Sequence, residues 1–441
     1  MCWIYKATFQ TMNLRPTLFT VLLLSSFLTP TPILAQKLPF SFNAKGLVVL
    51  SDADMAASAF VDGKLKTERG VNDALTTISW GKNTTDIRAT ALVVSNSATS
   101  WAKPLDFSKD GKMAFVVENR KALDRGKEKV KNVKTDFPAG NMLYAININD
   151  LNKPKTASGI SVGNSPMSIS IHPNGDMLAV AVTEKDNEIA LVDFKKGSLG
   201  RVHSFSHKVV EKDVRVTDIT WHPSGKFLAV TLEPISKVAF YEVSMVNNVW
   251  RVTPFGDPVP AGDSPSAGVF SADGNNYIVT DLKSSSAKAK GEPGDLLVIH
   301  FDETAKQHKV MHTVKVGYNP ESFALSPDGR FIAVSNVNTS YYPYDNAAFS
   351  SLSSLMLFSF DASTGALAQL DEQTWEGVLP KSIAFDNDSK SLVLTSYEDL
   401  DLNDKRRGSL HFWEITPENK LQKTGFKLSL TRGAHFVKVV R

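Results

Sequence analysis

The sequence lacks the residues and motifs of several common chemistries. It has one cysteine, Cys2, in 441 residues. Because Cys2 falls in a segment that we expect to be removed, the mature chain has no disulfides, no thiol chemistry and no cysteine-ligated metal. The sequence also contains no H-E-x-x-H, G-x-S-x-G, C-x-x-C-H or glycine-rich phosphate loop. These absences argue against a zinc hydrolase, a serine nucleophile elbow, attached haem and nucleotide binding.

A net charge is also nearly absent once the N-terminus is set aside. Residues 1–35 are predicted to be a secretory signal peptide, with a short apolar run at 18–28 behind Lys6 and Arg15 and cleavage after Ala35. A run of eleven residues is too short to span a bilayer comfortably. The remaining chain has 47 basic and 46 acidic residues, which gives no electrostatic case for nucleic acid or an anionic membrane. We therefore expect an exported protein, periplasmic or secreted, without a membrane span after cleavage.

One type of segment recurs six times in the chain. Its clearest copies read SPMSISIHPNGDMLAVAV at 165–182, RVTDITWHPSGKFLAVTL at 215–232 and NPESFALSPDGRFIAVSN at 319–336. Each copy is an apolar strand, a short turn and a second apolar strand, and a third apolar strand and a more polar fourth strand follow. Four antiparallel strands that recur every 49 to 64 residues predict the blades of a β-propeller.

The two ends of the chain predict a seventh blade. TRGAHFVKVV at 431–440 resembles a first strand without its successor, and AKGLVVLSD at 44–52 resembles a second strand without its predecessor. Ring closure removes exposed edge strands, so we expect the C-terminal strand to pair with the N-terminal strands. The prediction is an all-β, seven-bladed β-propeller with four antiparallel strands per blade over residues 45–441, after an N-terminal linker at 36–44.

The repeat of the type NPESFALSPDGRFIAVSN resembles that of a known family. It is similar to the seven-bladed lactonase-type propellers, the phosphogluconolactonase-like family, and to the YVTN-repeat exported propellers. The resemblance covers residues from about 45 to 441 and implies the fold and, as an activity, the hydrolysis of lactones. Its turn-and-strand pattern is shared by propellers of unrelated activities, and no catalytic signature of the family transfers residue by residue.

Unequal connections predict which face of the propeller is functional. Turns between first and second strands are short, whereas four connections between second and third strands are long: 119–140, 282–294, 337–353 and 397–408. In an up-and-down blade these loops emerge on the same face as the linkers that enter the innermost strands. Long variable loops on a rigid scaffold commonly carry binding and catalysis, so we expect the function on this face.

Two groups of residues are predicted to bind a ligand on that face. Lys103, Asp218 and Lys381 precede or begin innermost strands and would give a polar mouth of mixed sign. Tyr341, Tyr342 and Tyr344 concentrate in the loop at 336–349. Tyrosines suit stacking on a sugar or contact with a protein partner, although this loop could equally cover the adjacent blade.

Three further residues of the predicted mouth are candidates for catalysis. His435 is its one histidine and is a candidate general base, with Glu321 as an alternative activator of water. Arg432 is a candidate for stabilising a developing oxyanion. A lone histidine also serves commonly as a structural residue, and both readings of His435 stay open at this point.

A metal site is predicted where second strands end. Asp52, Glu118, Asp281 and Asn336 align at this position of their repeats. Carboxylate and amide oxygens around a funnel suit a hard divalent cation such as calcium or magnesium. The same side chains could instead satisfy backbone donors at strand ends.

Two functions fit these observations. The first is an exported binding or interaction protein that holds a protein, glycan or small-molecule ligand on the long-loop face. The second, which rests on the family resemblance, is a lactonase-like hydrolase of cyclic esters with a polar funnel mouth that could also bind a metal. The missing catalytic motifs favour the first function, and the sequence leaves the ligand and the oligomeric state open.

Overall fold

The structure is a computed structural model that describes residues 40–80, 87–99, 103–123, 126–208, 214–283, 291–400 and 408–441. The chain divides into two units, Met1–Gln36 and Lys37–Arg441, and all described residues belong to the second. The predicted signal peptide, residues 1–35, lies outside the described residues and stays a prediction. No helix in the described part of the chain is both long enough and apolar enough to cross a membrane.

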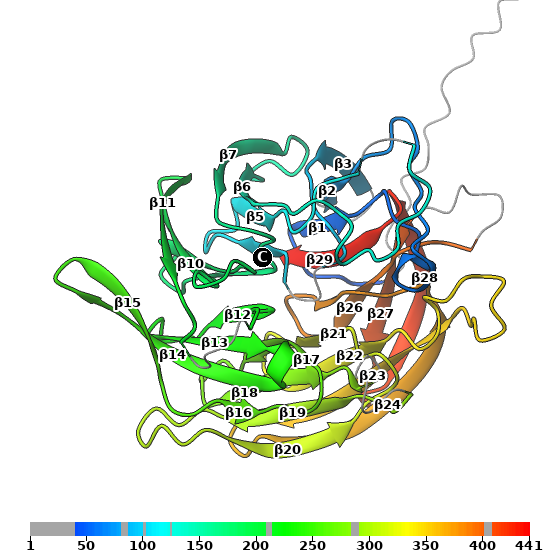
Figure 1. Cartoon of the computed structure of the whole chain (residues 1–441). Helices are drawn as coiled ribbons and strands as arrows, with labels where there is room; N and C mark the ends of the chain where they lie inside the picture. The colour runs from blue at the N-terminus through cyan, green and yellow to red at the C-terminus, as the bar shows by residue number, and fades with distance from the viewer. Residues whose placement is uncertain are drawn as a thin grey trace, which may run out of the picture. The chain divides into compact units, whose positions relative to one another are not determined.

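The unit Lys37–Arg441 folds into seven antiparallel sheets, each with four strands in its main path, which confirms the predicted propeller (Figure 1). First strands of neighbouring sheets contact one another, as β8 does with β4 and β12, so these strands surround the centre. Blade 1 consists of β4 (Leu105–Phe107), β5 (Met113–Val117), β6 (Met142–Asn147) and β7 (Lys155–Ser161). Blade 2 consists of β8 (Ser168–Ile171), β9 (Met177–Ala181), β10 (Ile189–Lys195) and β11 (Ser198–Phe205). Blade 3 consists of β12 (Asp218–Trp221), β13 (Phe227–Leu232), β14 (Lys237–Val246) and β15 (Val249–Pro254), with β16 (Val259–Pro260) paired to β14.

The remaining blades repeat this order. Blade 4 consists of β17 (Pro265–Phe270), β18 (Asn276–Asp281), β19 (Asp295–His300) and β20 (Lys309–Lys315). Blade 5 consists of β21 (Ser322–Leu325), β22 (Phe331–Asn336), β23 (Leu352–Asp361) and β24 (Ala366–Glu376). Blade 6 consists of β25 (Ile383–Phe385), β26 (Ser391–Ser396), β27 (Gly408–Ile415) and β28 (Leu421–Leu430). Blade 7 orders β29 (Ala434–Val440), β1 (Gly46–Ser51), β2 (Ala74–Trp80) and β3 (Ile87–Val93). The short helices α1 (Ala59–Asp62) and η1 (Glu233–Ile235) lie in loops.

The apolar pattern of each strand follows from its place in a blade. Second strands such as β13, with the sequence FLAVTL, are buried at every residue because neighbouring blades cover both of their faces. The fourth strand β20 alternates exposed and half-buried residues, since one of its faces meets solvent. Continuous apolar runs therefore become inner strands, and alternating runs become outer strands.

Short turns join first and second strands on the face opposite the long loops. In the turn that follows β12, Gly225 takes a φ of 74°, a conformation that favours glycine. The ring of His222 accepts the Ser224 N–H at its Nδ1, and its Nε2 lies 3.0 Å from the carbonyl oxygen of Gly274 in the next blade. These contacts fix the turn and join neighbouring blades.

The chain ends close the ring as predicted. β29 pairs antiparallel with β1, with Gly46 opposite Val440 and Val49 opposite Val437, and Figure 1 shows the red C-terminal strand beside the blue N-terminal one. The described part of the predicted linker, residues 40–44, is packed: Phe40 and Phe42 are buried against Phe412. The fold thus begins a few residues before the first strand.

Candidate functional site

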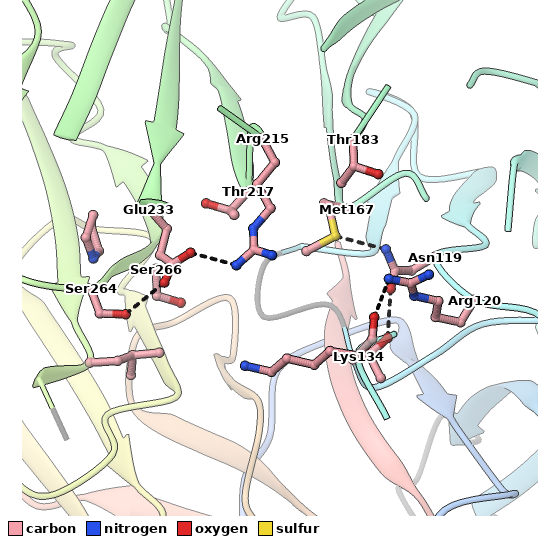
Figure 2. Close-up of a pocket in the computed structure, with 13 residues that line it drawn as sticks. Asn119, Arg120, Lys134, Met167, Thr183, Arg215, Thr217, Glu233, Ser264 and Ser266 are labelled. Carbon is pink, nitrogen blue, oxygen red and sulfur yellow. Dashed lines mark hydrogen bonds and ion pairs between the residues drawn. The ribbon is translucent and has the colours of Figure 1, made fainter. Parts of the chain in front are cut away.

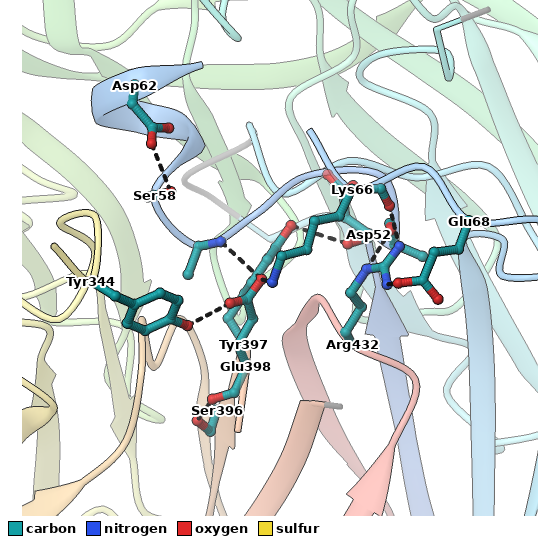
Figure 3. Close-up of polar contacts among 12 residues, drawn as sticks. Asp52, Ser58, Asp62, Lys66, Glu68, Tyr344, Ser396, Tyr397, Glu398 and Arg432 are labelled. Carbon is teal, nitrogen blue, oxygen red and sulfur yellow. Dashed lines mark hydrogen bonds and ion pairs between the residues drawn. The ribbon is translucent and has the colours of Figure 1, made fainter. Parts of the chain in front are cut away.

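The long-loop face is held together by an apolar cluster of its own. The structure adds a fifth long connection to the predicted ones, residues 52–73 between β1 and β2, which carries α1. We call the buried cluster that the described loops form the loop-face core, and its members are Met55, Ala57, Ala59, Leu65, Ala98, Val133, Phe137, Val337, Val378, Leu379 and Tyr397. Glu398 ties this region further, since its carboxylate accepts bonds from Lys66 Nζ at 2.8 Å and from the Tyr344 hydroxyl at 2.6 Å (Figure 3).

A pocket opens on the same face over blades 1 to 4 (Figure 2). Its lining comes from linkers that enter innermost strands and from loops that leave second strands, and it encloses about 110 Å³. Four of its side chains are charged: Arg120, Lys134, Arg215 and Glu233. The pocket therefore combines one carboxylate with three cations.

Glu233 and Arg215 form the ion pair of one wall. Glu233 begins η1 directly after β13, and Arg215 lies in the linker that enters β12. Arg215 Nη2 lies 2.9 Å from Glu233 Oε2, while Glu233 Oε1 has a longer contact of 3.4 Å with Ser264 Oγ. The Glu233 side chain is 31 % exposed, so part of it is accessible to water.

Arg120 and Lys134 form the opposite wall, and both come from the loop between β5 and β6. Burial, together with the charge of Arg215, lowers the pKa of Arg120. The Nε of Arg120 is buried without a hydrogen-bond acceptor in the described part of the chain. Burial lowers the pKa of Lys134. The carboxylates of Glu321 and Glu233 act against this decrease, and the positive charge of Arg215 adds to it. This wall therefore carries the positive charges of Arg120 and Lys134, and the N–H donor at Arg120 Nε has no acceptor among the described residues.

The predicted mouth residues lie instead along the central channel, whose volume is about 480 Å³. Lys103 Nζ lies 3.0 Å from Asp218 Oδ2 and 2.7 Å from the Gly268 carbonyl oxygen. Lys381 Nζ lies 2.8 Å from Glu321 Oε2. The structure thus brings four predicted residues together as two ion pairs, and each pair neutralises itself.

His435 and Arg432 do not join Glu321 in one catalytic group. His435 is 2 % exposed, and its Nε2 lies 2.7 Å from Asn96 Oδ1. Arg432 donates to the carbonyl oxygens of Ala53 and Lys66 and to Glu68 (Figure 3). Both side chains therefore hold loops in place, and neither faces the pocket over blades 1 to 4.

The tyrosine loop folds down onto the protein. Tyr341 is half-buried against the loop-face core, and burial raises its pKa to about 12. Its ring lies 4.9 Å from that of Tyr342. The Tyr344 hydroxyl is bonded to Glu398, and its ring lies 5.0 Å from Phe349. Of the two readings of this loop, the structure matches the one in which it covers the neighbouring blade.

The four predicted metal ligands do not converge. Asp281 accepts the backbone N–H groups of Asp263 and Ser264, and Asn336 donates to Ser354 Oγ. Glu118 accepts the Asn141 N–H at 3.3 Å. Asp52 lies instead among the carboxylates of Asp54 and Asp73, the one group of three or more possible metal ligands among the described residues. A shared repeat position fixes a height along the propeller axis but not a common direction of the side chains.

Sequence reasoning sought the site on the long-loop face, where this pocket opens, but did not single out Arg120, Lys134 or Arg215 of its lining. Arg120 and Lys134 belong to the basic stretch at 118–134, and Arg215 stands three residues before β12, where the other mouth residues were sought. Asp54 and Asp73 lie in a connection whose length is evident only once the β1 and β2 pairing is known. The sequence signal that could have identified Arg215 is that a charged residue shortly precedes an innermost strand.

The fold and the site define a seven-bladed β-propeller with a charged pocket on its loop face. The family described as Lactonase, 7-bladed beta-propeller, matches residues 66–402, and the chain belongs to this family. No curated protein matches the chain in sequence.

Solved structures with the same fold are distant in sequence. A suspected 6-phosphogluconolactonase from Bacteroides fragilis is 15 % identical with a TM-score of 0.61, over 90 % of this chain and 98 % of that one. The periplasmic gluconolactonase of Pseudomonas aeruginosa is 18 % identical with a TM-score of 0.58, over 90 % and 99 %. A hypothetical selenium-binding protein from Sulfolobus tokodaii is 8 % identical with a TM-score of 0.62, over 91 % and 94 %. These likenesses concern the fold alone.

Proposed function

We propose that this protein is a lactonase that hydrolyses a cyclic ester bearing an acidic group, in the pocket over blades 1 to 4. Membership of the lactonase family supports the reaction class. The observation that carries the proposal is the pocket itself, in which the Glu233 carboxylate faces a wall formed by Arg120 and Lys134. A base and several cations in one pocket are the groups that lactone hydrolysis requires.

Glu233 is the proposed general base. Its Oε2 is held by Arg215, which leaves Oε1 to accept a proton from a water molecule. That water attacks the lactone carbonyl carbon, and the carbonyl oxygen becomes an oxyanion beside the guanidinium of Arg215. The oxyanion then collapses, the ring C–O bond breaks, and the leaving alkoxide takes up the proton that Glu233 accepted, so that the product is a hydroxy acid and the carboxylate of Glu233 is restored.

The positive wall is proposed to bind the acidic group of the substrate. The orphaned Nε of Arg120 is a buried donor that an anionic oxygen would satisfy. The positive charges of Arg215 and Arg120 repel each other, and a bound anion would offset this repulsion. A neutral lactone makes neither contact, so we expect the enzyme to prefer phosphorylated or carboxylated lactones.

The test is hydrolysis of a lactone panel by the wild type and by Glu233→Gln. We expect Glu233→Gln to lower kcat by about 10²- to 10⁴-fold with little change in KM, the typical contribution of a general base. Arg120→Gln should raise KM for a phosphorylated lactone and leave KM for glucono-δ-lactone nearly unchanged.

Two further variants locate the site. Glu242→Gln removes an exposed glutamate of β14 outside the pocket and should leave both constants unchanged. Glu321→Gln breaks the pair with Lys381 in the central channel. If Glu321→Gln abolished turnover and Glu233→Gln did not, the channel and not the pocket would be the active site. A wild type that binds anionic lactones without turnover would be a binding protein, and the proposal would be wrong.

A further inference from the structure

Three carboxylates gather beneath the long-loop face, away from the lactonase pocket. Asp52 follows β1, Asp54 lies two residues further, and Asp73 precedes β2. One oxygen from each of the three lies within 4.8 Å of those of the other two. Asp52 and Asp73 are buried, and Asp54 is half-buried. Like charges at this separation repel strongly in a buried site.

One oxygen of this cluster is left without a partner. Asp52 is 1 % exposed. Its Oδ2 accepts the Ala98 N–H at 2.7 Å and a bond from Ser97 Oγ at 3.2 Å. Its Oδ1 has no hydrogen-bond donor in the described part of the chain, and the groups that crowd its carboxylate are Asp54 and Asp73. A buried carboxylate oxygen without a donor is costly unless something positive occupies the space before it.

The protein supplies too little positive charge to balance the three carboxylates. Arg432 faces Asp54, but its guanidinium is already bonded to Ala53, Lys66 and Glu68. Because Arg432 also pairs with Glu68, the three carboxylates keep an excess of negative charge that a divalent cation would reduce.

We propose that Asp52, Asp54 and Asp73 bind a hard divalent cation, calcium or magnesium, that fixes the loop between β1 and β2. Oxygen-only ligands are the preference of both ions, and half-buried Asp54 leaves a way in from solvent. The cation would join this loop to the linker before β4, since Asp52 also accepts the bonds from Ser97 and Ala98. Thr99 of that linker bonds Asn119 at 2.7 Å, and both residues line the lactonase pocket. The cation therefore supports the pocket from below without touching substrate.

The experiment measures thermal unfolding of the full chain after treatment with EDTA and dialysis. Millimolar Ca²⁺ or Mg²⁺ should raise the Tm by about 3 °C, the rise expected for a domain of this size at a ligand concentration about 100-fold above Kd. NaCl at equal ionic strength serves as the control for screening. The ion that gives the larger shift, and a stoichiometric heat in calorimetric titration, identifies the cation.

Variants then assign the shift to these residues. Asp73→Asn and Asp54→Asn should each abolish the cation-dependent rise in Tm. Asp54→Asn changes a half-buried side chain, so it guards against a failure of Asp73→Asn to fold. Asp281→Asn is the matched control, because Asp281 is also a buried carboxylate at the end of a second strand. It should lower the Tm while leaving the cation-dependent rise intact.

Two results would overturn the proposal. The first is no binding heat and no Tm shift with either cation, in which case the cluster is neutralised by bound protons. The second is an undiminished shift in both Asp54→Asn and Asp73→Asn, which would place the cation elsewhere. Neither result bears on lactone hydrolysis, because no readout here depends on turnover.

Discussion

At the residue scale, hydrogen-bond partners decide the role of His435. The Asn96 amide nitrogen donates to the carbonyl oxygens of Ser51 at 3.2 Å and Val94 at 2.9 Å. Asn96 therefore presents its oxygen to the ring, and His435 Nε2 must donate, which fixes a neutral tautomer. Burial, followed by the charge of Lys381, lowers the pKa of His435 to about 3. A proton acceptor of this kind is poorly suited to general-base catalysis near neutral pH.

His435 should make the protein sensitive to acid. Its pKa falls from 6.5 unfolded to about 3 folded, so between these values the unfolded state binds more protons and stability decreases as the pH falls. The loss reaches about 2 kcal/mol by about pH 5. His435→Gln keeps a donor for Asn96 and should flatten the fall in Tm between pH 6.5 and about 5, as measured by thermal denaturation.

His411 provides a parallel case for this prediction. It is buried in blade 6, and burial lowers its pKa to about 3 as well. His411→Gln should flatten the same slope, and the two effects should add, because the residues lie in different blades. An unchanged slope in His435→Gln would contradict the prediction. Loss of lactone turnover in His435→Gln at an unchanged Tm would instead support the catalytic role expected from the sequence.

At the element scale, the junction between β28 and β29 is tightly constrained. Gly433 takes a φ of +83°, and a Cβ there would lie 1.7 Å from the carbonyl oxygen of Asp52. The Asp52 N–H also bonds the Gly433 carbonyl oxygen at 2.9 Å. Close approach of two backbones and a left-handed conformation both require glycine at this position.

Gly433→Ala should therefore destabilise the protein by about 3 kcal/mol, the sum of left-handed strain and an unrelieved clash. Gly329 is the matched control, with a φ of +73° and no atom within 4 Å of an added Cβ. Gly329→Ala should cost only about 1 kcal/mol. The comparison is made by thermal and denaturant unfolding, and equal losses in the two variants would show that the contact with Asp52 does not constrain the junction.

The strand elements could be predicted from the sequence more completely than the loops. The place of a strand in its blade determines the apolar pattern of its sequence, as β13 and β20 show. A loop side chain is positioned by its partners, and those partners are distant in sequence. Tyr344 meets Glu398, and Arg432 meets Glu68, across gaps of 54 and 364 residues. The sequence therefore predicted where the long loops lie, while the direction of their individual side chains needed the structure.

At the scale of the whole molecule, ring closure by the two chain ends could be predicted because both ends carried incomplete repeats. The structure gives the reason that closure matters: Val437 and Val439 of β29 belong to one apolar cluster with Leu47 and Val49 of β1. Without β29, β1 would expose its backbone edge and this cluster would open. Closure by one strand pair makes the stability of every blade depend on the C-terminus.

Deletion of residues 434–441 should therefore abolish cooperative unfolding and give an aggregating protein, because the free edge of β1 becomes a template for pairing with other chains. A circular permutant tests whether strand pairing, rather than chain order, is what matters. It joins Arg441 to Phe40 by a flexible linker and opens the chain between Lys196 and Gly197, in the turn from β10 to β11. The Lys45 N–H bonds the Val440 carbonyl oxygen at 3.0 Å, so the joined ends already lie close.

The permutant keeps β29 beside β1, and we expect it to be soluble and to unfold in one transition, measured by circular dichroism and size-exclusion chromatography. The deletion should fail both measurements. A deletion protein that remained monomeric with an unchanged Tm would show that six blades close without β29. Failure of the permutant alone would instead mean that the hairpin of β10 and β11 must be continuous, since the new ends remove the covalent turn between these two paired strands. The two outcomes therefore separate a need for ring closure from a need for one particular chain order.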